Sequence, residues 1–114
     1  MPFPERGEIY LVNIPGRLKA AKSRPALIIS MDVRNRLAND VIVVPISTNL
    51  RLSPTHVKLD KGEGGLDRTS MAKCEQTTTI HKSYLIRGPF SGAIPSQKMI
   101  EIEKAIQRAI GIVI

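Results

Sequence analysis

The sequence predicts one mainly β domain of the α+β class, spanning residues 1–114 and closed by a C-terminal α-helix. Its apolar runs are short and strand-sized, and turn residues separate them. An apolar pattern with a period of 3.6 residues occurs near the end of the chain. With 114 residues, 42% of them hydrophobic, the chain is expected to bury one core.

Two predicted strands, 24–31 and 41–46, are apolar at nearly every position, so both of their faces should be covered. Pro45 in the second of them indicates an edge position or a bulge. Residues 32–40 are expected to form a polar connection. Other strands are expected at 6–14, 55–59, 70–74 and 77–80.

The helix is expected from residue 96, where Ser96 is placed to cap the first turn. Gly111 suits the residue that ends it. The tail, residues 112–114, is apolar and should be buried against the core or against another subunit. One face of the helix carries Met99, Ile102, Ile106 and Ala109.

The charge is strongly positive and unevenly placed. Lys and Arg number 17 against 10 Asp and Glu, giving +7 at pH 7 and a pI near 10.0. No acid lies between Glu8 and Asp32, a stretch that contains Arg17, Lys19, Lys22 and Arg24. This pattern favours a polyanionic partner such as nucleic acid, although a solvated basic loop has the same composition.

Several classes of protein are disfavoured. The apolar runs are too short for a membrane span, and residues 1–5 do not resemble a signal peptide. The lone Cys74 excludes an internal disulfide and agrees with a reducing cytoplasm. One Cys and two distant His lack zinc spacing, and no phosphate-binding Gly-rich loop occurs, so neither a metal nor a cofactor is expected.

Polar residues stand at one end of each strongly apolar strand. Arg24 begins the first, and Ser47 and Thr48 follow the second. If the two strands pair antiparallel, the guanidinium lies beside a hydroxyl at one rim of the sheet. We expect the functional site at this rim.

The chain carries a series of short motifs that resemble, in the same order, those of the MazF/PemK-type toxins of bacterial toxin–antitoxin modules. Each motif is weak alone, but their order and spacing together are specific. They run through most of the chain: RGEIYLV (6–12), SRPALIIS (23–30), VVPIST (43–48), PTHV (54–57), GLDRTS (65–70), Glu75-Gln76 and TIHK (79–82).

The resemblance implies a small SH3-like β-barrel with a C-terminal helix, and a homodimer. It implies a sequence-specific, metal-independent endoribonuclease that cleaves single-stranded RNA and is neutralised by a cognate antitoxin. Arg24 and Ser47 align with the family's catalytic pair, and Thr48 is an alternative hydroxyl.

Other residues are candidates for RNA contact. Glu75 and Gln76 either bind RNA or are a polar interruption between strands. The loop that precedes Arg24 should guide the substrate, but it departs from the family pattern, so the sequence does not give the cleavage motif. The candidates in this loop are Arg17, Lys19 and Lys22.

An arginine and a hydroxyl residue suit the chemistry of RNA cleavage. The 2′-OH of RNA can attack the adjacent phosphate, and an Arg fork matches the oxygens of the phosphorane that forms. A hydroxyl donates a further bond or relays a proton. Arg24 is assigned to charge stabilisation, because arginine is not deprotonated in proteins. No Glu–His pair is evident near these segments, and His56 and His81 are interpreted as structural or surface residues.

Two other functions remain open on the sequence. A toxin of the CcdB type binds gyrase without cutting RNA, and it does not require the Arg-Pro and Ser-Thr rim. A non-catalytic nucleic-acid-binding barrel is the other alternative. Base-stacking platforms usually use more aromatic residues than the two Tyr and two Phe present here.

Overall fold

The computed structural model describes residues 3–13 and 23–113. Its helices are α1 (Asp32–Leu37) and α2 (Ser96–Ala109), and its short 3-10 turns are η1 (Glu63–Gly65), η2 (Cys74–Gln76) and η3 (Lys82–Tyr84). Its strands are β1 (Ile9–Val12), β2 (Arg24–Ile28), β3 (Asp40–Ser47), β4 (His56–Leu59), β5 (Ser70–Lys73), β6 (Thr78–His81) and β7 (Leu85–Arg87).

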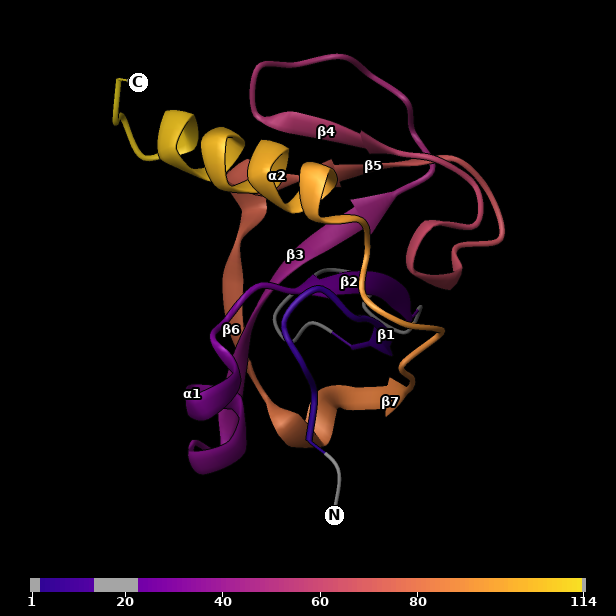
Figure 1. The fold of residues 1–114 in the computed structure, drawn as a ribbon, viewed down its shortest axis with the longest axis vertical. Coiled ribbons are helices and arrows are strands. Elements are labelled where there is room, and N and C mark those ends of the chain that lie inside the picture. The colour runs from indigo at the N-terminus through magenta and orange to yellow at the C-terminus, as the bar shows by residue number, and fades with distance from the viewer. Residues whose placement is uncertain (1–2, 14–22, 114) are drawn as a thin grey trace.

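The strands form one antiparallel sheet in the order β4-β5-β3-β2-β1-β7, with β6 also paired to β3 (Figure 1). β3 is central: β2 lies on one side of it, and β6 and then β5 lie on the other. Since β6 leads through η3 into β7, which pairs with β1, the sheet curls toward a barrel. In the part described, no ladder joins β6 to β7. The mainly β fold with a C-terminal helix is confirmed.

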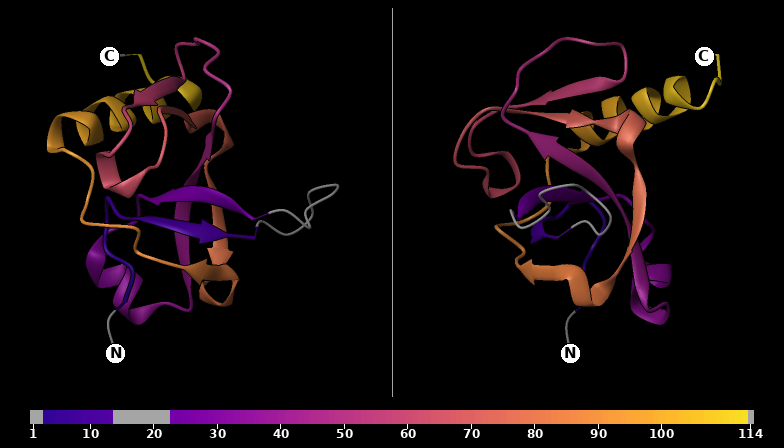
Figure 2. Two further views of the ribbon diagram at one scale, coloured as in Figure 1. Left: turned by 90° about the vertical axis from the view of Figure 1, so that its right-hand side faces the viewer. Right: turned by 180° about the vertical axis from the view of Figure 1, so that it is seen from behind.

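The sheet separates two apolar clusters because alternate residues of a strand face opposite sides. Leu27 of β2 belongs to the larger cluster, which α2 covers with Met99, Ile102 and Ala105. Ala26 belongs to the smaller cluster inside the curl of β1, β2, β3 and β6. Figure 2 shows α2 lying across the end of the molecule that carries β4 and β5. Both faces of β2 and β3 are thus covered, as predicted.

The ends of α2 differ in how well they were predicted. Capping by Ser96 is wrong, because Pro95 occupies the cap position and no side chain bonds the first turn. Gly111 is confirmed at the C-terminus: its φ is +88°, and its N–H donates to Arg108 O at 3.1 Å. Ile112 and Val113 are 45% and 96% exposed, so burial of the tail against the core is wrong.

The predicted polar connection at 32–40 contains α1, a short helix held by a buried amide. Asn35 is fully buried, and its Nδ2 donates to Ser30 O at 2.9 Å. The Ser30 hydroxyl in turn bonds Asn35 Oδ1 and accepts from Ile42 N–H at 3.0 Å. These bonds link the turn after β2 to β3. Six residues are too few for a periodic signal, which is why the sequence did not indicate this helix.

The expectation of an edge strand or bulge at Pro45 is wrong, since Pro45 is buried in the central strand opposite Ala26. Ile42 bonds toward the β2 side, so the backbone groups of residue 45 face the other side. There the β6 ladder ends at Val43, and the β5 ladder begins at Ile46. The missing N–H of proline therefore falls in a gap between two partners.

The first strand is shorter than the predicted 6–14. Arg6 and Gly7 form a turn before it, with Gly7 at φ +95° and its N–H bonded to Ile28 O at 2.8 Å. Only Gly takes this conformation without strain. The end of the predicted strand, Ile14, lies outside the described residues.

Candidate active site

The antiparallel pairing of β2 with β3 brings Arg24 and Ser47 together. Ala26 pairs with Pro45, and Arg24 and Ser47 each lie two residues further toward the same rim. A step of two keeps side chains on one face of a strand, so both side chains share the face of that pair. Both line one cavity of about 130 Å³. The proximity predicted from the two strand ends is confirmed.

Ser47 and Thr48 face opposite sides of the strand end. Thr48 lines a different cavity, together with Pro25, which is the neighbour of Arg24. Ser47 Oγ accepts the N–H of Asn49 at 3.1 Å. That bond orients the oxygen and leaves its own hydrogen to donate. The geometry therefore favours Ser47 as the partner of Arg24, and a catalytic role for either hydroxyl stays a prediction.

Arg24 is exposed, and it takes part in none of the ion pairs of the described residues. Its guanidinium is a cation with five N–H donors. Lys73 lines the same cavity and adds a second cation. This small cavity, with two cations and a hydroxyl, suits a phosphate group.

A second cavity, of about 650 Å³, extends the first and shares its residues Lys73 and Gln76. Lys73 of β5 pairs with His56 of β4. Because paired residues of a ladder point to the same face, the two cavities form one groove across the ends of β2, β3, β5 and β4. We call this the rim groove. It runs from Arg24 and Ser47 to His56 and Glu75.

A Glu–His pair that the sequence did not reveal lies in the rim groove. His56 Nε2 is 3.0 Å from Glu75 Oε2, and His56 Nδ1 is 2.9 Å from the carbonyl oxygen of Arg51. Glu75 Oε1 accepts from Thr55 Oγ1 at 2.9 Å. Both partners of the ring are acceptors, so the two bonds form together only when both ring nitrogens carry hydrogen. The expectation that no such pair is present is wrong for the rim groove as a whole.

This network changes the interpretation of Glu75. Partial burial raises the pKa of its carboxyl, but hydrogen bonds from His56, the backbone and Thr55 outweigh burial and leave the pKa lowered. The carboxylate is charged and both of its oxygens are occupied. Glu75 therefore ties η2 to the β3–β4 loop and to β4. Contact of Glu75 or Gln76 with RNA stays a prediction, and Gln76 stands where the two cavities meet.

The other residues that could take part in binding or chemistry are described in turn. Arg17, Lys19 and Lys22 lie outside the described residues. His81 Nδ1 accepts the N–H of Ser83 at 3.0 Å and so caps η3, a structural role. Burial raises the pKa of the Cys74 thiol to about 12, which makes it a poor nucleophile.

Across 3–13 and 23–113, no group of three His, Cys, Asp or Glu is placed to hold a metal ion. Neither helix in these ranges has the length and apolar character that crossing a bilayer demands.

Comparisons with known proteins agree with this geometry. Residues 5–110 match the sequence profile of the PemK-like, MazF-like toxins of type II toxin–antitoxin systems. The endoribonuclease MazF of Staphylococcus epidermidis is 30% identical over 111 residues, which cover 94% of this chain and 91% of that protein. The endoribonuclease EndoA of Bacillus subtilis is 32% identical over 85 residues, or 71% and 73% of the two chains.

A solved structure is also similar. An endoribonuclease in complex with its cognate antitoxin, from a mycobacterial species, superposes with a TM-score of 0.81 at 27% identity, covering 97% of this chain and 98% of that one. The chain belongs to the PemK/MazF family of toxins.

Proposed function

We propose that this toxin is an endoribonuclease that cuts single-stranded RNA at the Arg24–Ser47 end of the rim groove, without a metal ion. The observation that carries the proposal is the shared cavity of Arg24 and Ser47, which lie on one face of two antiparallel strands. Membership of the PemK/MazF family supports it, because relatives at 30% and 32% identity are endoribonucleases.

In the proposed reaction the 2′-OH of the substrate gives up its proton to water and attacks the adjacent phosphorus, and the 5′-oxygen leaves and takes up a proton from water. The products are a 2′,3′-cyclic phosphate and a 5′-OH end. Arg24 forms charge-assisted bonds to the phosphorane, where negative charge develops. Ser47 donates its hydroxyl hydrogen to the same centre, while Asn49 N–H holds its oxygen.

The rest of the rim groove binds the strand on one side of the cut. Lys73 provides a cation near the scissile phosphate, and the chain as a whole carries +7. Phosphate contacts of this kind bring affinity that falls as salt rises. The His56–Glu75 pair keeps the β3–β4 loop in position, and both nitrogens of the His56 ring are occupied. Sequence preference then depends on base contacts away from Arg24.

We further propose that a cognate antitoxin blocks the rim groove, as an acidic segment would by pairing with Arg24 and Lys73. The similar mycobacterial endoribonuclease is in complex with its cognate antitoxin, which supports a protein partner of this kind. Because the proposed RNA substrate and antitoxin are both cytoplasmic molecules, we propose that the toxin acts in the cytoplasm.

A homodimer is proposed through an exposed apolar patch. Arg108 near the end of α2 donates to Pro54 O at 3.2 Å, which brings the helix end beside the β3–β4 loop. Exposed apolar patches rimmed by polar residues mark protein interfaces. The patch consists of Ile110, Ile112 and Val113 after the helix, and Leu50 and Leu52 in the loop are further exposed apolar residues.

The proposal is tested by mapping the ends of a long RNA incubated with the protein in EDTA. The wild type should cut at discrete sites, and Arg24→Ala should lower the rate by roughly 100-fold or more. Arg36→Ala is the matched control, since Arg36 is also exposed and lies outside the rim groove. Gyrase inhibition without RNA cleavage would favour a protein-binding toxin. RNA binding without turnover would favour a non-catalytic barrel.

A further inference from the structure

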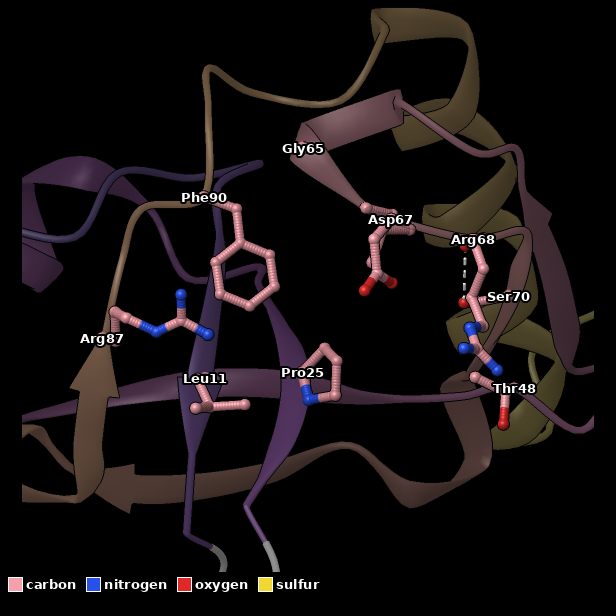
Figure 3. A pocket seen from close by; sticks show the side chains of 10 residues that line it. Leu11, Pro25, Thr48, Gly65, Asp67, Arg68, Ser70, Arg87 and Phe90 are labelled. Atoms are coloured by element: carbon pink, nitrogen blue, oxygen red, sulfur yellow. Dashed lines mark hydrogen bonds between the residues drawn. The ribbon is translucent and has the colours of Figure 1, made fainter.

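A separate cavity of about 340 Å³ opens on the reverse face of the same strand ends (Figure 3). Thr48 and Pro25 line it, and these are the sequence neighbours of Ser47 and Arg24. Its volume is within the range of small-molecule sites, roughly 300 to 1,000 Å³. The cleavage chemistry at Arg24 makes no use of it, so it is free to serve another part of the substrate.

Three of the residues that line the cavity are apolar and lie side by side in Figure 3: Leu11, Pro25 and Phe90. The guanidinium carbon of Arg87 lies 5.5 Å from the centre of the Phe90 ring. Gly65 lets the η1 turn approach the backbone and Cβ of Phe90 closely, because a Cβ there would meet Phe90 Cβ at 2.8 Å. Aromatic rings and arginine planes are the surfaces on which unpaired bases of RNA stack. The Phe90 ring and the Arg87 guanidinium therefore suit a flat, unsaturated ligand.

The rim of the cavity carries three charged side chains: Asp67, Arg68 and Arg87. All three are exposed, and within the described residues none of them forms an ion pair. Figure 3 shows the Asp67 carboxylate and the Arg87 guanidinium on either side of the Phe90 ring, near Pro25. A carboxylate and guanidinium groups that do not pair with one another retain hydrogen-bonding capacity for a ligand with both donors and acceptors.

The carboxylate determines which part of an RNA strand can enter. Asp67 repels phosphate, so a base edge that carries N–H groups is the part that approaches it favourably. Guanine alone among the four bases has two adjacent N–H donors, N1–H and N2–H, on its Watson–Crick edge. These match the two oxygens of a carboxylate, as an arginine fork does. Guanine also has the acceptors O6 and N7, which arginine recognises.

Resting on the endoribonuclease function proposed above, we propose that this cavity binds a guanine base of the RNA beside the cleaved bond. Asp67 accepts from its N1–H and N2–H, and Arg87 or Arg68 donates to its acceptors. The strand crosses the sheet rim, so that its phosphate meets Arg24 on one face and a neighbouring base reaches Asp67 on the other. The cavity thus fixes one position of the cleavage motif.

The first test compares wild type with Asp67→Asn on an RNA library randomised around the cut, with ends mapped by sequencing. The wild type should prefer guanine at one fixed position. Asp67→Asn should lose that preference by roughly 10-fold or more while still cutting RNA. Asp60→Asn is the matched control, because it removes the same charge from an exposed aspartate outside the cavity and should keep the preference.

The second test places inosine, which lacks the 2-amino group, at the preferred position. Wild-type cleavage should fall several-fold, and Asp67→Asn should cut both RNAs equally. The inference is overturned if wild type cuts without a guanine preference, or if Asp67→Asn retains that preference. If wild type cuts no RNA, the endoribonuclease proposal fails as well, so the two failures are distinguishable.

Discussion

The hydroxyl of Ser47 lies on the same face of the strand ends as Arg24, whereas that of Thr48 lies on the reverse face. We expect Ser47→Ala to slow the chemical step by roughly 100-fold, because a donor aimed at the developing charge is lost. Thr48→Ala should leave that step within a few-fold of wild type. Single-turnover cleavage at saturating RNA measures both, with circular dichroism to verify folding. If Thr48→Ala slowed the chemical step more than Ser47→Ala, the catalytic hydroxyl would be that of Thr48.

The proximity of Arg24 and Ser47 at the rim could be predicted because it depends on two local facts. Each strand has its polar group at one end, and antiparallel pairing joins opposite ends. The choice between Ser47 and Thr48 required the register, which the sequence does not specify. The His56–Glu75 contact spans 19 positions and depends on how η2 folds beside β4, so no local pattern could indicate it.

At the scale of elements, the Glu75 carboxylate holds η2, β4 and the β3–β4 loop together. Partial burial raises its pKa, but the bonds from His56, the backbone and Thr55 outweigh burial and lower it. The stability that Glu75 adds is therefore present above the unfolded-state pKa, about 4.3, and is lost as pH falls through the lower folded value.

Glu75→Gln should thus unfold more easily than wild type at neutral pH, and the difference should shrink on acidification below about pH 4. Urea unfolding at several pH values measures it. Glu101→Gln provides the control, because Glu101 is exposed on α2 and should show little difference from wild type. A Glu75→Gln difference that is constant with pH would contradict the role of the charged carboxylate.

Elements with long apolar patterns were predictable, and those that depend on single tertiary bonds were not. The period of α2 identified Met99 and Ile102, both of which are buried. The sequence did not predict α1, because the stability of this helix depends on buried hydrogen bonds between Asn35 and Ser30. Pro45 was misread because the gap between the β6 and β5 ladders is not visible in the residues of β3.

At the scale of the whole molecule, the dimer that we propose would bury the exposed apolar patch at the end of α2. Val113→Asp should shift the protein toward monomer, because a charge in the patch opposes burial of Val113, which is 96% exposed in one chain. Sedimentation velocity over a concentration series measures the change. Ile86→Asp, on an exposed residue of β7, is the control. A wild type that is monomeric at all concentrations would contradict the dimer.

We propose that the protein cuts RNA by using the substrate's own 2′-OH at the Arg24–Ser47 rim. The most direct measurement compares an oligoribonucleotide containing one mapped site with the same oligonucleotide carrying a 2′-deoxy nucleotide at the scissile position, both in EDTA. We expect a 2′,3′-cyclic phosphate and a 5′-OH from the first oligonucleotide, and no cleavage of the second. Cleavage of the deoxy substrate at the same bond would contradict it.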